Sequence, residues 1–170
     1  SPFIEHVQTR VLFGQELSIQ EHHKEIREIV VASSDKIKTL ADTITEHRNS
    51  GGDFRHQKYE RPFSEAYLSY FFPQNTCKLQ IVLLELLQHS KLPRSLNVVD
   101  LGIGTGTSFI AILDFLWLLS EICNLYSIEL PIETLSLAGI EESVANCEVT
   151  KEMLIAYREL IERFCESDVQ

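Results

Sequence analysis

Three glycines and one acidic residue form the segment of this chain whose residue types and spacing best suit binding chemistry. Asp100 stands two residues before Gly102, and Gly102, Gly104 and Gly106 alternate with other residues. Glycine allows backbone conformations that a Cβ atom forbids, and it lets a ligand lie against the main chain. A helix that begins just after such a turn directs free N–H groups and its positive dipole end at the ligand. The segment therefore predicts a ligand-binding turn.

The spacing of the glycines distinguishes between kinds of nucleotide site. A dinucleotide fingerprint has the form G-x-G-x-x-G, which would need glycine at the position of Thr107. The third glycine comes one residue earlier instead, at Gly106. This argues against a dinucleotide-binding protein, which remains the third-ranked alternative.

Residues 98–107, Val-Val-Asp-Leu-Gly-Ile-Gly-Thr-Gly-Thr, resemble motif I of the class I S-adenosylmethionine-dependent methyltransferases. The resemblance implies that Asp100 helps to hold the methionine amino group and that the glycines pass beneath the adenosyl part. Residues 137–143 add a second match, because Glu141 stands where the family has the acid that takes both ribose hydroxyls. A carboxylate offers paired acceptors to two neighbouring O–H donors. The resemblance thus assigns six residues to S-adenosylmethionine: Asp100, Gly102, Gly104, Thr105, Gly106 and Glu141.

Two features of the sequence depart from the family pattern. Asp100 and Glu141 are 41 residues apart, whereas the analogous acid of a dinucleotide unit follows after about 20 residues; Glu129 is therefore a competing ribose ligand. The resemblance also covers only residues 96–170, which hold two of the family's seven or so strands. We expect either a truncated chain, which we favour, or a sheet completed by another chain, because two parallel strands leave exposed edges.

The elements that must position these residues follow from the hydrophobic pattern. Strand, glycine turn and helix in this order open a doubly wound α/β sheet. The predicted fold class is α/β, with a helical N-terminal region followed by the first part of a Rossmann-like class I methyltransferase fold. The predicted elements of this second part are a strand at 96–101, a helix from about 107, a strand at 134–141 and a helix at 150–165.

The first 95 residues predict helices. A stripe of mainly apolar residues at steps of four and three follows the capping-box pair Ser18 and Glu21, so one long helix, or two split at Ser33, is expected. Such a stripe usually packs on its own protein, and a coiled-coil dimer is the alternative. We predict a loop at 49–53, a short helix at 62–72 ended by Pro73, and a helix at 77–89. The predicted domains are a helical region, 1–95, and a partial S-adenosylmethionine-binding domain, 96–170.

Charge and composition limit the partners. Residues 1–95 hold 12 basic and 12 acidic side chains, whereas residues 96–170 hold 3 and 13. This does not support direct nucleic-acid binding, which needs Lys and Arg at phosphates.

The apolar stretch 109–123 is shorter than the roughly 20 residues of a membrane span, so we expect no membrane partner and a cytoplasmic protein. The four cysteines lack metal-ligand spacing, so no metal is predicted. A homo-oligomer could form through the N-terminal helix or a completed sheet.

The predicted function is that of the S-adenosylmethionine-binding part of a methyltransferase whose methyl acceptor the sequence does not identify. This piece alone is expected to be inactive, since no residue is assigned as a catalytic base. The candidates before the turn are more often structural: His56, Arg61, Tyr67 and Tyr70. The alternative is a non-catalytic regulatory or assembly protein that retains a methyltransferase-like fold.

Overall fold

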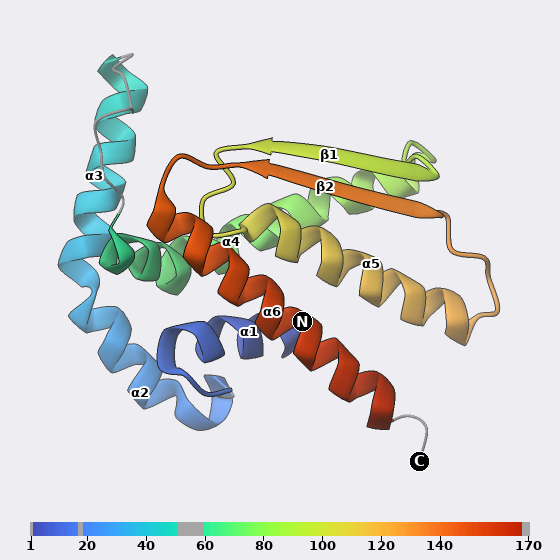
Figure 1. Cartoon of the computed structure of the whole chain (residues 1–170), viewed down its shortest axis with the longest axis horizontal. Helices are drawn as coiled ribbons and strands as arrows, with labels where there is room; N and C mark the ends of the chain where they lie inside the picture. The colour runs from blue at the N-terminus through green and yellow to red at the C-terminus, as the bar shows by residue number, and fades with distance from the viewer. Residues whose placement is uncertain (1, 17–18, 51–59, 168–170) are drawn as a thin grey trace.

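The chain folds into a mixed α/β structure that is mostly helical and contains one β-α-β unit (Figure 1). It was analysed as a computed structural model, which describes residues 2–16, 19–50 and 60–167. The elements in chain order are α1 (Pro2–Phe13), α2 (Ile19–Ala32), α3 (Ser34–Ser50), α4 (Arg61–Gln88), β1 (Ser95–Leu101), α5 (Thr107–Leu125), β2 (Thr134–Ile140) and α6 (Val144–Ser167).

The two strands form a parallel sheet in which Ser95 lies opposite Thr134 and Leu101 opposite Ile140. Because both strands run in the same direction, their carboxyl ends meet at one edge of the sheet. Helices α4, α5 and α6 all lie on one face of the sheet (Figure 1). On the opposite face, which no described element covers, Leu101 is 75% exposed and Ile140 is 62% exposed. The sheet thus has one packed face and one open face.

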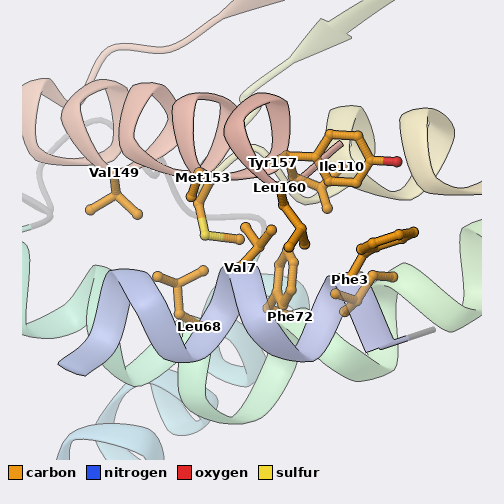
Figure 2. Packing of buried hydrophobic residues seen from close by; sticks show 11 residues of the cluster. Phe3, Val7, Leu68, Phe72, Ile110, Val149, Met153, Tyr157 and Leu160 are labelled. Carbon is orange, nitrogen blue, oxygen red and sulfur yellow. The ribbon is translucent and has the colours of Figure 1, made fainter. Parts of the chain in front are cut away.

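The hydrophobic core lies among four helices and joins the two ends of the chain. Figure 2 shows side chains from α1, α4, α5 and α6 packed together. They include Phe3 of α1, Phe72 of α4 and Met153 of α6. Phe3, Trp117 and Phe164 also pack edge to face, with ring centroids 4.2 to 5.5 Å apart. Residues on both sides of position 95 therefore fill one core.

The predicted break at Pro73 is wrong, because α4 runs without interruption from Arg61 to Gln88. Proline inside a helix removes one backbone hydrogen bond and costs about 3 kcal/mol. The residues around Pro73 offset this cost by burial: Leu68, Phe72 and Thr76 are fully buried. Contacts with several other helices thus override the local preference of proline.

Other elements agree with the sequence pattern to different degrees. The strands predicted at 96–101 and 134–141 are confirmed to within one residue as β1 and β2, and the predicted helix start near Thr107 is confirmed. The long N-terminal helix is split at Ser33, and the stripe faces the protein, with Leu40 2% exposed. Ser18 lies outside the described residues, as do residues 51–53 of the predicted loop; residues 49 and 50 of that loop are helical. Helix α6 begins at Val144, six residues earlier than predicted, and α1 was not predicted at all.

Helix α5 is the most apolar element. It is 19 residues long, longer than the apolar stretch suggested, and by length and composition alone it could cross a membrane. A core helix passes the same test, and α5 has the features of one. Its Asp114 is fully buried and accepts a hydrogen bond from Gln80 of α4 at 2.7 Å.

Candidate functional site at the carboxyl edge of the sheet

The glycine turn connects β1 to α5 and is held against the end of β2. The carbonyl oxygen of Ile140 accepts hydrogen bonds from the amides of Gly102 (2.8 Å) and Ile103 (3.2 Å). Gly102, Gly104 and Gly106 all have positive φ, at 82°, 59° and 80°. Side chains with a Cβ rarely adopt this left-handed conformation, so the turn requires glycine at each of these positions.

The three glycines differ in what lies beside them. A Cβ atom at Gly102 would meet nothing within 4 Å, and one at Gly104 would meet only the Gly102 carbonyl oxygen at 3.9 Å. A Cβ atom at Gly106 would lie 2.9 Å from Cγ2 of Thr150 on α6. The first two glycines therefore border open space that a ligand could enter, whereas the third allows α6 to approach the turn.

Glu141 follows β2 directly and reaches back to the turn. Its Oε2 atom accepts a hydrogen bond from the Gly104 amide, and its Oε1 atom accepts one from the Ser143 amide, both at 2.8 Å. Each carboxylate oxygen has two lone pairs, so both can accept a further hydrogen bond. The structure thus brings together two of the sequence-predicted residues, Gly104 and Glu141, from segments 37 residues apart.

A chain of hydrogen bonds extends from Glu141 to the first turn of α4. Beyond Ser143, the amide of Asn146 donates to the Ser143 hydroxyl at 3.2 Å. The hydroxyl of buried Ser64 donates to the Asn146 side-chain oxygen at 2.7 Å. Thr150 adds a second link between α6 and the turn, since its hydroxyl donates to the Gly104 carbonyl at 2.8 Å. The turn is therefore fixed by α4, β2 and α6 together.

Asp100 and Thr105 occupy different environments. Asp100 is half-buried near the end of β1, and its Oδ2 atom accepts a hydrogen bond from the Ser108 hydroxyl in the first turn of α5. Thr105 is only 2% exposed, and its hydroxyl lies 3.4 Å from that of Thr107. The Asp100 carboxylate thus lies beside the helix N-terminus, whereas the side chain of Thr105 faces the protein interior.

The competing ribose ligand Glu129 does not lie beside the turn. It precedes β2, and its carboxylate lies 3.6 Å from the guanidinium of Arg94, which precedes β1. Both residues line a cavity of about 300 Å³ at the amino ends of the strands. The parallel register places this cavity at the edge of the sheet opposite the glycine turn.

The candidate catalytic side chains of α4 are engaged in contacts within the protein. Arg61 binds the Glu152 carboxylate through two hydrogen bonds of 2.6 and 2.7 Å, which raise the pKa of Arg61 and lower the pKa of Glu152. The Tyr67 hydroxyl accepts a hydrogen bond from Asn75 at 2.8 Å. Tyr70 is 46% exposed and packs edge to face on Phe71. His56 lies outside the described residues.

Several residues that hold the site together were missed by sequence reasoning, among them Ser64 and Asn146. Ser108 and Thr150 hold the acid and the turn, and Gly139 allows the turn to pack on β2. A Cβ atom at Gly139 would lie 2.6 Å from Cδ1 of Ile103. The contact of Ser108 with Asp100 lies within the strand–turn–helix unit, whereas the contacts of Thr150 and Gly139 depend on packing between segments far apart in the sequence.

Comparison of the chain with protein-family models, with curated proteins and with solved structures gave no match in any of the three. Among the described residues, no group of three or more His, Cys, Asp and Glu side chains is placed to hold a metal ion. The glycine motif and the geometry of this edge of the sheet are therefore the features that bear on function.

Proposed function

We propose that the chain binds S-adenosylmethionine at the carboxyl edge of its sheet and contributes this site to a methyltransferase. The observation that carries the proposal is the convergence of the glycine turn with Glu141. An open space beside Gly102 and Gly104 lies next to a carboxylate whose two oxygens retain accepting capacity. In open α/β sheets, ligands bind outside the carboxyl ends of the strands.

The residues present suit the chemical groups of this cofactor. A carboxylate that can accept two further hydrogen bonds suits a pair of ribose hydroxyls. Asp100, beside the first turn of α5, supplies a negative charge for an amino group. When bound, S-adenosylmethionine supplies an electrophilic methyl group on sulfur. The protein's part is to hold and orient it, which accounts for much of the rate enhancement in such displacements.

A protein that binds the cofactor without transferring its methyl group is the second candidate. One observation favours it. Arg61 and Tyr67, two of the side chains before the turn that could act in catalysis, are committed to Glu152 and Asn75. A base must be within hydrogen-bond reach of the proton that it removes. This candidate shares the cofactor site and differs only in the chemistry.

The cofactor site can be tested by titrating S-adenosylhomocysteine, the demethylated product, into isotopically labelled protein and following the amide resonances by NMR. NMR detects the weak binding expected from a partly open site. We expect shifts at Gly102, Gly104 and the first turn of α5, with dissociation constants raised at least tenfold by Glu141→Gln and by Asp100→Ala. Glu142→Gln, at an exposed neighbouring position, is the matched control.

Two comparisons separate the alternatives. NAD tested in the same way should shift these resonances less than S-adenosylhomocysteine, and a stronger response to NAD would favour a dinucleotide site. If S-adenosylhomocysteine at millimolar concentration leaves the glycine resonances unchanged, the proposal fails. Transfer of label from methyl-labelled S-adenosylmethionine to an acceptor in a cell extract would exclude the second candidate.

A further inference from the structure

A stripe on the outer side of α4 has a basic residue at one end, an acidic residue at the other and apolar residues between them. Two such stripes running in opposite directions could pair basic with acidic and apolar with apolar residues. Ile81 is 60% exposed and Val82 is 52% exposed, in the carboxyl half of a long helix. Lys78 stands three residues before Ile81, and Glu85 stands three residues after Val82; both are exposed. Residues spaced by three, four and seven share one side of a helix. We call these four residues the α4 stripe.

The α4 stripe points away from the rest of the protein. Leu83, between its members, is 6% exposed and belongs to the buried side of α4. Gln80 donates a hydrogen bond to Asp114 of α5, which fixes the side on which α5 packs. Figure 1 shows the carboxyl half of α4 at the back of the molecule, partly hidden by β1, β2 and the start of α5. Contiguous exposed apolar side chains are a feature of interaction surfaces.

We propose that a second copy of this chain binds the α4 stripe, through an antiparallel pair of α4 helices related by a two-fold axis between Ile81 and Val82. This arrangement places Ile81 against Val82 of the partner and Lys78 against Glu85 of the partner. A two-fold interface uses the same patch on both copies and must be self-complementary, as this patch is. Helices of opposite direction also have favourably aligned dipoles.

Charge pairing favours the α4 stripe over the open face of the sheet. Helix α4 contains two basic residues, Arg61 and Lys78, and two acidic residues, Glu65 and Glu85, so its formal charge is zero. The outward-facing residues of β1 and β2, by contrast, are uncharged. A contact between two copies there would lack the pairing of opposite charges that the α4 stripe provides.

Sedimentation equilibrium over micromolar to millimolar concentrations of the whole chain tests the proposal. We expect a monomer–dimer equilibrium whose dissociation constant rises at least tenfold with Ile81→Asp, since this change buries a charge in an apolar contact. Val31→Asp is the matched control, because Val31 is 62% exposed on α2. Circular dichroism should show that both variants remain folded.

Charge exchange tests the antiparallel geometry. Lys78→Glu and Glu85→Lys each replace two attractive pairs by two repulsive ones, and each should weaken the dimer by about threefold to tenfold at low salt. The double variant K78E/E85K restores opposite charges across the axis and should recover the original affinity. An equimolar mixture of the two single variants should form a heterodimer more readily than either forms a homodimer.

Several outcomes would overturn the proposal. One is a monomer at every concentration. Another is a dimer that is unaffected by Ile81→Asp but lost with Leu101→Asp, which would place the contact on the open face of the sheet. A third is a double variant no better than the two single variants, which would exclude the antiparallel pairing.

Discussion

The carboxylate of Glu141 accepts the amide hydrogen of Gly104 at 2.8 Å, so the residue after β2 holds the centre of the turn after β1. The same carboxylate also accepts the Ser143 amide, which lies just before α6. One side chain thus joins three segments: the glycine turn, the end of β2 and the start of α6. The Glu141 carboxylate, which we propose binds the ligand, thus also stabilises the protein without ligand.

Replacing Glu141 should therefore affect both stability and ligand binding. Glu141→Gln keeps the size of the side chain but exchanges one accepting oxygen for an NH₂ group that cannot accept the amide hydrogen. We expect a loss of about 1–3 kcal/mol in the free energy of unfolding, measured by urea denaturation. Glu142→Gln should change it by less than about 0.5 kcal/mol, as is usual for surface substitutions. Equal effects of the two changes would contradict the dual role of Glu141.

The glycines of the turn should differ in their tolerance of alanine. Gly102→Ala meets only the strain of a positive φ, about 1–2 kcal/mol, whereas Gly106→Ala adds a clash with Cγ2 of Thr150. The loss of unfolding free energy should therefore be larger for Gly106→Ala. Adding Thr150→Ser, which removes that methyl group and keeps the hydroxyl, should recover part of the difference. If the effects of Gly106→Ala and Thr150→Ser on the free energy of unfolding simply add, the methyl group of Thr150 does not determine the cost of a side chain at position 106.

Pro73 offers a stabilising substitution. Pro73→Ala would restore the backbone hydrogen bond that proline lacks inside α4, a gain of up to about 3 kcal/mol. Greater freedom of the unfolded chain subtracts about 1 kcal/mol. We therefore expect a net increase of about 1–2 kcal/mol in the free energy of unfolding, seen as a higher urea midpoint with an unchanged slope. A lower midpoint would mean that the ring of Pro73 contributes essential packing.

The buried Tyr157 should make the free energy of unfolding depend on pH in the alkaline range. Its hydroxyl is buried and finds no hydrogen-bond partner among the described residues, and burial followed by the nearby charge of Asp114 raises its pKa. The unfolded state therefore loses the phenolic proton at lower pH than the folded state does. The contribution of Tyr157 to the free energy of unfolding is fully present below about pH 10 and decreases as the pH rises further.

The matched pair Tyr157→Phe and Tyr126→Phe tests this relation. At neutral pH, Tyr157→Phe removes an unsatisfied buried hydroxyl and should be neutral or stabilising by up to about 1 kcal/mol. Above pH 10 it should also reduce the slope of stability against pH. Tyr126 is 68% exposed, so Tyr126→Phe should leave that slope as it is in the parent chain. A strong loss of stability in Tyr157→Phe would indicate a bonded hydroxyl.

The sequence predicted the β-α-β unit because its signals are local. The run of apolar residues before Asp100, the alternating glycines and the apolar helix after them specify strand, turn and helix with little help from the rest of the chain. The resemblance assigned the turn and Glu141 to one ligand, and the parallel direction of the two strands brings them to the same edge of the sheet. The approach of Thr150 to Gly106 did not, because it depends on the angle at which α6 packs.

The misplaced elements have a common physical cause. Helix α4 continues through Pro73, and α6 includes residues 144–149, because buried contacts with other helices outweigh the local preferences. Helix α1 had a signal that was overlooked. Phe3, Ile4, Val7 and Val11 have helical spacing, and Gly14 follows the last turn with positive φ, as a helix C-cap does.

The core shared by α1, α4, α5 and α6 limits how the β-α-β unit can be used in protein engineering. Here Phe3 and Val7 from the first helix, with Leu68 and Phe72 from the fourth, fill the space against Met153 and Tyr157 (Figure 2). A graft of residues 96–170 alone would carry the glycine turn but expose this apolar surface to water. The module that can be transplanted is therefore the whole assembly of helices and strands.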